Sequence, residues 1–324
     1  MVTLVTGATG LVGNNVARRL LEKGTAVRVL VRANADPRPL AGLDIEVFEG
    51  DVRDSAAVDR AMRGTQAAVH AAAHVHIGWK GMSAARAINV EGSRNVALAA
   101  LREQARLVHV SSIDALATSS GLLPVDEDMP AVGGILCPYV VTKREAEQAV
   151  LQLVASGLQA SIVNPGFMIG PFDWKPSSGR MLLQVARGWG LFAPIGANSY
   201  CDVRDVAEAI ATALVHGKPG RRYILGGQTL SYFQAWRVFA QVTGGTPPMF
   251  PAGPLVRIGA GRFGDLVGAL TGCEPDVNSA ATAISAQKRN YTSARAMAEL
   301  GYRPRPLSEA AEAAWNWFRA NGYS

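Results

Sequence analysis

The sequence of 324 residues contains only three cysteines, and they lie far apart at positions 137, 201 and 273. A small, odd number of widely spaced cysteines predicts neither a disulfide framework nor a CxxC metal site. The first residues show no basic segment followed by an apolar segment and a small-residue cleavage site, so we expect no signal peptide. These absences favour a cytoplasmic setting.

Long uncharged apolar runs are also absent. A membrane-spanning helix needs about 18 consecutive apolar residues, and the nearest approach, Leu255–Leu270, is interrupted by Arg257, Arg262 and Asp265. Hydrophobic residues make up 48% of the chain and charged residues 18%, which is typical of a soluble globular protein. We therefore expect no membrane partner.

Runs of basic residues are missing as well, although the formal net charge is +6. The arginines stand mostly alone and are not interleaved with aromatic residues, so the charge does not indicate nucleic-acid binding. A preference for small anionic ligands explains the charge better. We expect a small-molecule partner and no nucleic acid.

Over its first two-thirds, the chain alternates apolar strand-like runs with Ala-rich helical stretches. This alternation is the signature of βαβ units, and strands this apolar suit a parallel sheet covered on both faces. The sequence therefore predicts an α/β fold with a doubly wound parallel sheet. The expected strands are Val2–Thr6, Ala26–Val31, Ile45–Glu49, Ala67–Ala71, Arg106–Ser111, Ala160–Val163 and Arg222–Leu225. The main expected helices are Asn14–Lys23, Ser55–Met62, Met82–Leu101, Lys143–Val154 and Ser308–Ala320.

Three glycines follow the first expected strand and open the first helix. Gly7 would form the tight turn, Gly10 would admit a pyrophosphate, and Gly13 would let the helix pack closely on the strand. A tight turn without a ligand is the alternative, but the strand–turn–helix context is the one that a Rossmann-type fingerprint requires. Phosphate would lie on the free amides of the helix N-terminus. The expected contact residues of the turn are Gly7, Thr9, Gly10, Leu11, Val12 and Gly13.

The end of the second strand indicates which nucleotide is bound. NAD enzymes usually carry an acidic residue there, whereas this strand ends at Arg32, and guanidinium groups bind phosphate well. We therefore favour NADP(H) over NAD(H), with Arg38 as a possible second clamp and a solvated surface arginine as the alternative. Asp51, which precedes Val52 after the third strand, would lie near the adenine or cap the following helix.

The alternating rhythm changes after residue 165. Proline and glycine cluster at 170–179 and 246–254, so we expect a smaller lobe packed over the edge of the sheet. The predicted organisation is an NADP-binding Rossmann domain in residues 1–165, completed by parts of 200–228. Residues 166–324 would form mainly a substrate-binding lobe.

Tyr139 and Lys143 are four residues apart in a segment of good helix formers, which predicts that they share one helical face. A nearby ammonium group favours the phenolate, so we expect Lys143 to lower the pKa of Tyr139 towards neutrality. Tyr139 could then donate or accept a proton. A pair at this spacing also arises by chance, so its meaning depends on the surrounding residues.

The surrounding residues resemble those of an extended short-chain dehydrogenase/reductase, within the NAD-dependent epimerase/dehydratase superfamily. The resemblance is greatest to its dihydroflavonol 4-reductase-like group. Besides Tyr139/Lys143, it rests on the glycine turn, Gly50-Asp51-Val52, His70-Ala71-Ala72-Ala73, Asn89-Val90-Glu91-Gly92, Val110-Ser111-Ser112, Asn164-Pro165-Gly166, Ile169-Gly170-Pro171, Asp202–Ala209 and Tyr223–Gly227.

The resemblance implies roles for individual residues. Tyr139 would exchange a proton with the substrate oxygen during hydride transfer, and Lys143 would also hold the nicotinamide ribose. Ser112, with Ser111 as its rival, would hydrogen-bond the substrate oxygen. Asn89 would brace the sheet rather than touch substrate. Further cofactor contacts are Arg32, Asp51, Val52, Ala71, Ala73, Pro165 and Gly166. His74 and His76 would line the mouth of the substrate site, with plain loop packing as the alternative, and Phe167 and Met168 would lie where a substrate pocket opens after the sixth strand. A homodimer formed through the helices at 82–101 and 143–154 is also implied.

Departures from the family pattern narrow the reaction. Dehydratases carry Thr-Asp-Glu where this chain has Ser112-Ile113-Asp114, so elimination chemistry is not expected and Asp114 is interpreted as structural. His70, His74 and His76 have no carboxylate or Cys companion, so we expect no zinc site. Phe172 and Trp174 suggest either an apolar pocket or core packing between the lobes.

These observations lead to one function and two alternatives. We expect an NADP(H)-dependent oxidoreductase that reduces a ketone or aldehyde of a small, partly apolar molecule, or oxidises the alcohol, with Tyr139 as acid/base. An epimerase of sugars or nucleotide sugars that retains its nucleotide is the first alternative. A non-catalytic NADP-binding sensor is the second, although a sensor has no need of the Ser112/Tyr139/Lys143 set.

Overall fold

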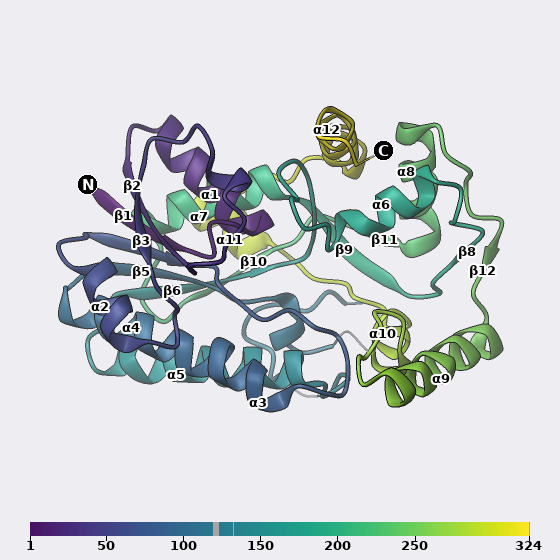
Figure 1. Ribbon diagram of the computed structural model, residues 1–324, viewed down its shortest axis with the longest axis horizontal. Helices are drawn as coiled ribbons and strands as arrows, with labels where there is room; N and C mark the ends of the chain where they lie inside the picture. Colours follow the sequence, from purple (N-terminus) through teal and green to yellow (C-terminus); the bar gives the residue numbers. More distant parts are fainter. Residues whose placement is uncertain (119–122, 132, 324) are drawn as a thin grey trace.

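The computed structural model describes residues 1–118, 123–131 and 133–323, and its largest element is a seven-stranded sheet (Figure 1). The strand order is β10-β6-β5-β4-β1-β2-β3, and every neighbouring pair is parallel. The strands are β1 (Val2–Thr6), β2 (Ala26–Val31), β3 (Ile45–Glu49), β4 (Ala67–His70), β5 (Arg106–Val110), β6 (Ala160–Pro165) and β10 (Arg222–Leu225). The predicted α/β fold with a doubly wound parallel sheet is confirmed.

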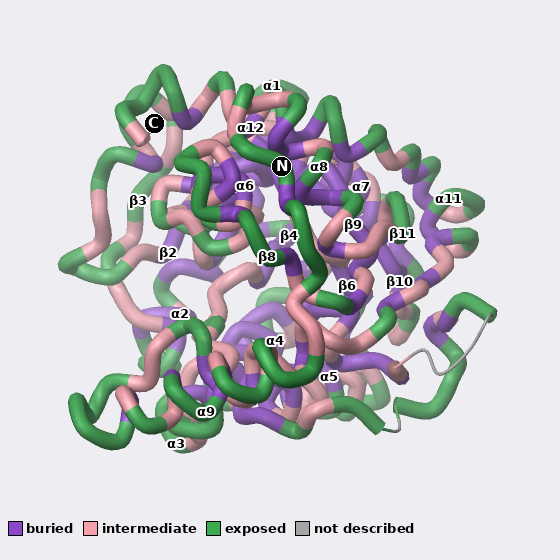
Figure 2. Tube along the Cα trace, turned by 90° about the vertical axis from the view of Figure 1, so that its right-hand side faces the viewer, coloured by how far each residue is buried: buried purple, intermediate pink, exposed green. Residues whose placement is uncertain are grey.

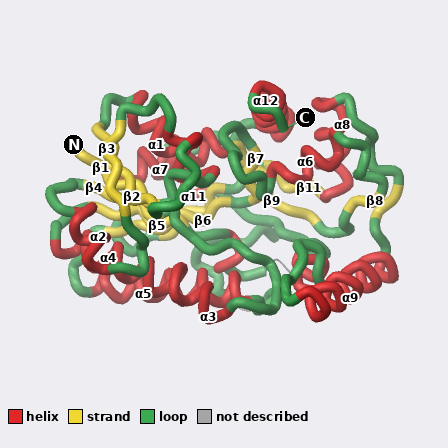
Figure 3. The backbone as a smooth tube through the Cα atoms, in the orientation of Figure 1, coloured by secondary structure: helices red, strands yellow, loops and turns green. Residues whose placement is uncertain are grey.

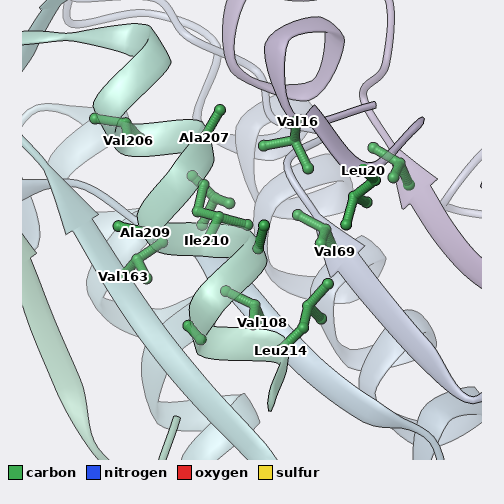
Figure 4. Packing of buried hydrophobic residues seen from close by; sticks show 14 of the residues in the cluster. Val16, Leu20, Val69, Val108, Val163, Val206, Ala207, Ala209, Ile210 and Leu214 are labelled. Atoms are coloured by element: carbon green, nitrogen blue, oxygen red, sulfur yellow. The ribbon is translucent and has the colours of Figure 1, made fainter. Parts of the chain in front are cut away.

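Helices cover both faces of this sheet, as the apolar strands led us to expect (Figure 3). One face carries α1 (Leu11–Glu22), α7 (Val203–His216) and α11 (Ala294–Leu300); the other carries α2 (Ser55–Met62), α4 (Gly92–Arg102) and α5 (Pro138–Ala155). Figure 4 shows the first core layer, where Val69 and Val108 of the sheet meet Val16 of α1 and Ile210 of α7. Alternation along β4 sends Val69 to this layer and Ala68 to the other.

Two predicted helices differ from the structure in ways that affect the site. The expected helix at 82–101 consists of α3 (Met82–Ala85), a π-helical stretch (Arg86–Glu91) and α4 in succession. The expected helix starting at Lys143 begins five residues earlier, at Pro138, because proline is tolerated in a first helical turn. Tyr139 therefore lies in the first turn of α5, and Lys143 in the second.

Apart from α7, β10 and α11, which belong to the large sheet and its covering layer, the elements after β6 form a second group at the right of Figure 1. A three-stranded sheet of order β11-β9-β7 supports α6, α8 and α12 around a separate apolar cluster. The elements of this group are β7 (Phe167–Ile169), α6 (Gly179–Ala186), β8 (Phe192–Ala193), β9 (Ala197–Asp202), β11 (Gln228–Ser231), α8 (Tyr232–Thr243), β12 (Phe250–Pro251), α9 (Pro254–Thr271), α10 (Ser279–Ile284) and α12 (Leu307–Ala320). Short 3-10 turns occur at Arg38–Leu40 and Ile113–Ala115.

Burial follows these layers, as Figure 2 shows for the sheet strands and the helix faces that cover them. Strands β1, β4, β5 and β6 are almost wholly buried, whereas most of α9 is exposed. Within the described part of the chain, none of the helices combines the length and apolarity needed to cross a membrane.

Candidate active site

The glycine turn lies where the chain reverses its direction of travel across the sheet, between β1 and β4. Ligands of open α/β sheets bind at such a switch point, outside the carboxyl ends of the strands. Gly7 has a φ of +75°, and a Cβ on it would lie 2.5 Å from the Ala72 nitrogen. A Cβ on Gly13 would lie 2.3 Å from the Gly7 oxygen, so close packing requires both glycines.

Gly10 differs from its two neighbours. The nearest atom to a Cβ built on it is the Gly7 oxygen at 3.4 Å, so protein packing leaves room here. Gly10 is also the N-cap of α1, with no side-chain cap and no acidic residue in the first helical turn. Thr9, Leu11 and Val12 surround this helix start. Open space beside free helix amides fits a bound pyrophosphate.

Arg32 is exposed immediately after β2 and forms no ion pair with any residue described by the structure. Its charge contributes to a lowered pKa of Asp51, although the larger cause is the hydrogen bond from Arg53. Asp51 does not cap α2, because Asp54 does so by accepting from the Ala56 and Ala57 amides. The helix-cap alternative for Asp51 is therefore wrong.

Arg38, the possible second clamp, is occupied by a neighbour. Its guanidinium forms an ion pair with Asp36 at 2.7 Å and lies over the ring of Trp174. Arg32 is thus the more accessible cation for an anionic ligand beyond β2.

The segment after β4 is fixed by polar contacts from the π-helical stretch. The Asn89 side-chain oxygen accepts from the His74 amide at 2.7 Å, while its nitrogen donates to the His74 carbonyl and to Thr142 of α5. Asn89 therefore braces the loop after β4 against α5, rather than the sheet against its own helix. Ala71 and Ala73 lie half-buried in the same segment, where Gly7 meets the backbone of Ala71 and Ala72.

Two of the three histidines of this region are engaged by other side chains. His70 is buried between Thr6 and Ser93, and burial lowers its pKa to about 3. His76 contacts Glu274 through Nε2 at 2.9 Å. Glu274 also accepts from the amides of Trp79 and Lys80, so it holds the whole loop. No cluster of metal-binding side chains occurs among the described residues.

Tyr139, Lys143 and Ser112 meet at the carboxyl end of β5, and all three are buried. Ser112 is the second residue after β5, and it caps the next turn by accepting from the Asp114 amide at 3.1 Å. Its hydroxyl donates to the Asp114 carboxylate at 3.2 Å. The Lys143 ammonium donates to the Val110 carbonyl at 3.0 Å. Ser111 is buried without a side-chain partner among the described residues, so its role as rival to Ser112 stays open.

One expectation about this group is wrong. The pKa of Tyr139 is raised rather than lowered, because burial of the phenol and the nearby Asp114 carboxylate outweigh the opposing effects of Ser112 and Arg289. Lys143 does not bring the phenol towards neutrality; burial lowers its own pKa to about 8. Spacing along a helix predicted proximity, but it contained no information on burial.

Sequence reasoning missed two residues that shape this site. Arg289 is buried and forms an ion pair with Asp114, and its charge reaches Tyr139. Glu147 accepts from Asn164 at 2.7 Å, and Asn164 in turn donates to the Ser112 carbonyl. Glu147 lies one helical turn after Lys143 on the same face, which was a usable signal, but nothing around Arg289 marked it.

The aromatic residues after β6 pack in two different places. Phe167 and Met168 of β7 are half-buried, and Phe167 packs against Tyr200 at 5.2 Å between ring centres. Phe172 and Trp174 instead pack on Trp317, so core packing is the correct alternative for them. Pro165 and Gly166 are the predicted cofactor contacts in this part of the chain. Pro165 ends β6, and a Cβ on Gly166 would lie 2.3 Å from the Ser199 oxygen.

Comparison with known proteins gives consistent matches. Residues 3–226 match the model of the NAD dependent epimerase/dehydratase family. The chain is 33% identical to a Synechocystis sp. protein provisionally named dihydroflavonol 4-reductase, over 98% of this chain and 95% of that one. It is 31% identical to sterol demethylase protein B of Methylococcus capsulatus, over 99% of each chain. The crystal structure of gox2253 has 36% identity and a TM-score of 0.86, over 99% of each chain.

Proposed function

The chain belongs to the NAD dependent epimerase/dehydratase family, and from this membership we propose that it is an NADP(H)-dependent oxidoreductase. It reduces a ketone or aldehyde of a small, partly apolar molecule, or oxidises the corresponding alcohol. The observation that carries the proposal is the buried group of Ser112, Tyr139 and Lys143, at the same edge of the parallel sheet as the glycine turn. The family's relatives include both reductases and epimerases, so the choice between them rests on this chain's own residues.

The chain's residues supply the proton and the binding contacts of this reaction. A bound nicotinamide supplies or accepts the hydride. Tyr139 gives its phenolic proton to the carbonyl oxygen, and its raised pKa keeps that proton in place at neutral pH, which suits the direction of reduction. Ser112 donates to the same oxygen, where negative charge develops.

Lys143 positions and polarises this group. With a pKa of about 8 it is mostly charged at neutral pH, and its ammonium lies at the carboxyl end of β5. Its remaining donors can reach a ribose hydroxyl of the nucleotide. Asn164 and Glu147 hold the Ser112 backbone from the other side.

The preference for NADP(H) is supported by Arg32. It is the exposed cation at the end of β2, and no described residue within ion-pair distance engages it. A guanidinium there attracts a 2′-phosphate through paired hydrogen bonds, whereas a carboxylate would repel it. The Asp51 carboxylate forms its ion pair with Arg53 and leaves Arg32 unpaired.

Asp114 supports a reductase over a dehydratase. Elimination needs a carboxyl group free to move protons, but the Asp114 carboxylate is paired with Arg289 and Ile113 is fully apolar and buried. Tyr139 therefore remains the proton-transfer group of the site. An epimerase that retains its nucleotide is the second candidate, and copurification of the nucleotide is the result that would favour it.

The test is to follow NADPH and NADH consumption by the purified chain with a panel of apolar and aromatic ketones and aldehydes. The proposal expects turnover with NADPH added from solution. Tightly held nucleotide that never exchanges, with no consumption of added NADPH, would contradict it.

A further inference from the structure

Helix α9 (Pro254–Thr271) buries its glycines and exposes its large apolar side chains. Its only buried residues are Gly261, Gly264 and Gly268. Phe263, Leu266 and Leu270 are exposed to 68%, 56% and 79%. A helix on the surface of a globular protein normally shows the reverse arrangement.

The two faces of α9 are opposite one another. Each residue turns the helix by about 100°, so a side chain two positions after a glycine lies about 200° away from it. Phe263, Leu266 and Leu270 each stand two positions after one of the three glycines. Leu255 and Val256 fall on the same outward side and are exposed too.

The glycine face is fixed by close contacts, so α9 cannot turn its apolar side inward. A Cβ on Gly264 would lie 1.8 Å from the Val277 oxygen, and one on Gly261 would lie 2.9 Å from the Ser279 Cα. The Asp265 carboxylate accepts from the Ser279 amide at 3.0 Å, which locks the same orientation. The outward apolar side is therefore built into the packing of α9 on α10.

Exposed apolar residues continue beyond the helix. β12 leads directly into α9 and pairs with β8, and Phe250 and Phe192 stack at 5.8 Å between ring centres. Met249 and Trp189 are also exposed. We define the α9 face as Leu255, Val256, Ile258, Phe263, Leu266 and Leu270, and it is extended by Trp189, Phe192, Met249 and Phe250.

Positive charge accompanies the α9 face. Arg262 is exposed on the helix beside the apolar side chains, and Lys80 donates to the Gly268 carbonyl at 3.1 Å. The single acidic residue of the helix, Asp265, is engaged by Ser279. Basic residues beside an exposed apolar stripe match an anionic lipid surface, where the stripe enters the acyl boundary and the cations meet headgroups.

We propose that α9 is a membrane-surface docking helix, which lies in the plane of a bilayer containing anionic lipid. The absence of a spanning helix in the described chain fits this mode, since an interfacial helix does not cross the bilayer. A second copy of the chain is a poorer occupant, because symmetric pairing of this face would bring like-charged arginines together. The sequence led us to expect no membrane partner because it has no apolar run long enough to span a bilayer, and an interfacial helix does not need one.

The test uses the full chain and flotation with vesicles of phosphatidylcholine, with and without phosphatidylglycerol. We expect binding to the anionic vesicles, weakened by salt because the charges are exposed. The double variant Phe263→Glu/Leu266→Glu should bind at least about tenfold more weakly, because two apolar side chains no longer enter the lipid. Arg262→Ala should bind roughly fivefold more weakly.

A matched control separates this effect from a general change in charge. Val215→Glu/Met297→Glu places two acids at exposed apolar positions of α7 and α11, and it should bind as the wild type does. Circular dichroism checks that every variant is folded. Nucleotide and substrate are absent, so the result is independent of the proposed reaction.

Two outcomes would overturn the proposal. The first is that the wild-type protein does not float with anionic vesicles, or that the α9 double variant floats as well as the wild type does. The second is that the wild type sediments as a dimer and binds no vesicles, while the α9 double variant sediments as a monomer. In that case the α9 face would be an interface between copies.

Discussion

The guanidinium of Arg289 and the carboxylate of Asp114 form an ion pair beside Tyr139, with only 7% and 13% of the two side chains exposed. Asp114 raises the pKa of the phenol and Arg289 lowers it, so the pair limits the electrostatic effect of either charge alone. The pair also joins the loop after β5 to the segment after α10. The ion pair therefore connects the proton-transfer group at the carboxyl end of β5 to the segment that follows α10.

Breaking this pair on one side should destabilise the protein. Arg289→Gln leaves a buried carboxylate without its partner, which costs about 3–5 kcal/mol in comparable pairs. The free energy of unfolding in urea measures this loss. Adding Asp114→Asn should restore part of the stability, because no charge is then left buried. Equal stability of Arg289→Gln and the wild type would show that the pair is not buried in solution.

Arg32→Asp should change the choice of nucleotide. An acidic residue at the end of β2 repels the 2′-phosphate and suits ribose hydroxyls, so the ratio of NADPH to NADH affinity should fall at least about tenfold. Fluorescence titration with each nucleotide measures the ratio. Arg60→Asp, at an exposed arginine on α2, is the matched control. An unchanged ratio in Arg32→Asp would refute the phosphate-binding role.

Gly10→Ala should separate folding from nucleotide binding. Its Cβ would meet only the Gly7 oxygen, at 3.4 Å, so stability should stay within about 0.5 kcal/mol of the wild type. Backbone approach of a pyrophosphate would be blocked, and NADPH affinity should fall at least about tenfold. Gly13→Ala, with its Cβ 2.3 Å from the Gly7 oxygen, should instead destabilise the fold. Unimpaired NADPH binding by Gly10→Ala would place the phosphates elsewhere.

His70 should make the protein sensitive to acid. Its pKa is lowered from 6.5 to about 3 by burial, so the unfolded chain takes up a proton below pH 6.5 that the folded chain refuses. The contribution of neutral His70 to the free energy of unfolding is present above pH 6.5, and about 2 kcal/mol of it should be lost by pH 5. Urea unfolding at pH 7 and pH 5 measures the loss.

His70→Gln should reduce this loss between the two pH values. His216→Gln, at an exposed histidine at the end of α7, should lose as much stability as the wild type. An identical loss in His70→Gln and the wild type would show that His70 does not titrate in this way.

The sheet could be predicted closely from the sequence. β1, β2, β3 and β10 begin and end where their apolar runs do, because each run is bounded by polar or turn residues. Helix starts were less well predicted: α5 begins at Pro138 rather than Lys143, because a first turn tolerates residues that are poor helix formers.

The site could be predicted only as far as local motifs reach. The glycine turn and the serine after β5 each follow a predicted strand closely in the sequence, so Gly10 and Ser112 could be identified from their positions. Arg289 and Glu274 reach the site from distant segments, and sequence spacing contains no sign of such contacts. The pKa of Tyr139 was mispredicted for a related reason, since burial depends on the whole fold.

The most direct test of the account is the Tyr139→Phe variant, assayed with the carbonyl compound that the wild type reduces fastest. The variant loses only the phenolic hydroxyl, so NADPH affinity should stay within about threefold of the wild type while turnover falls about 100- to 10 000-fold. Loss of turnover with NADPH binding intact is the result that the proposed proton transfer predicts. Turnover close to that of the wild type would contradict it.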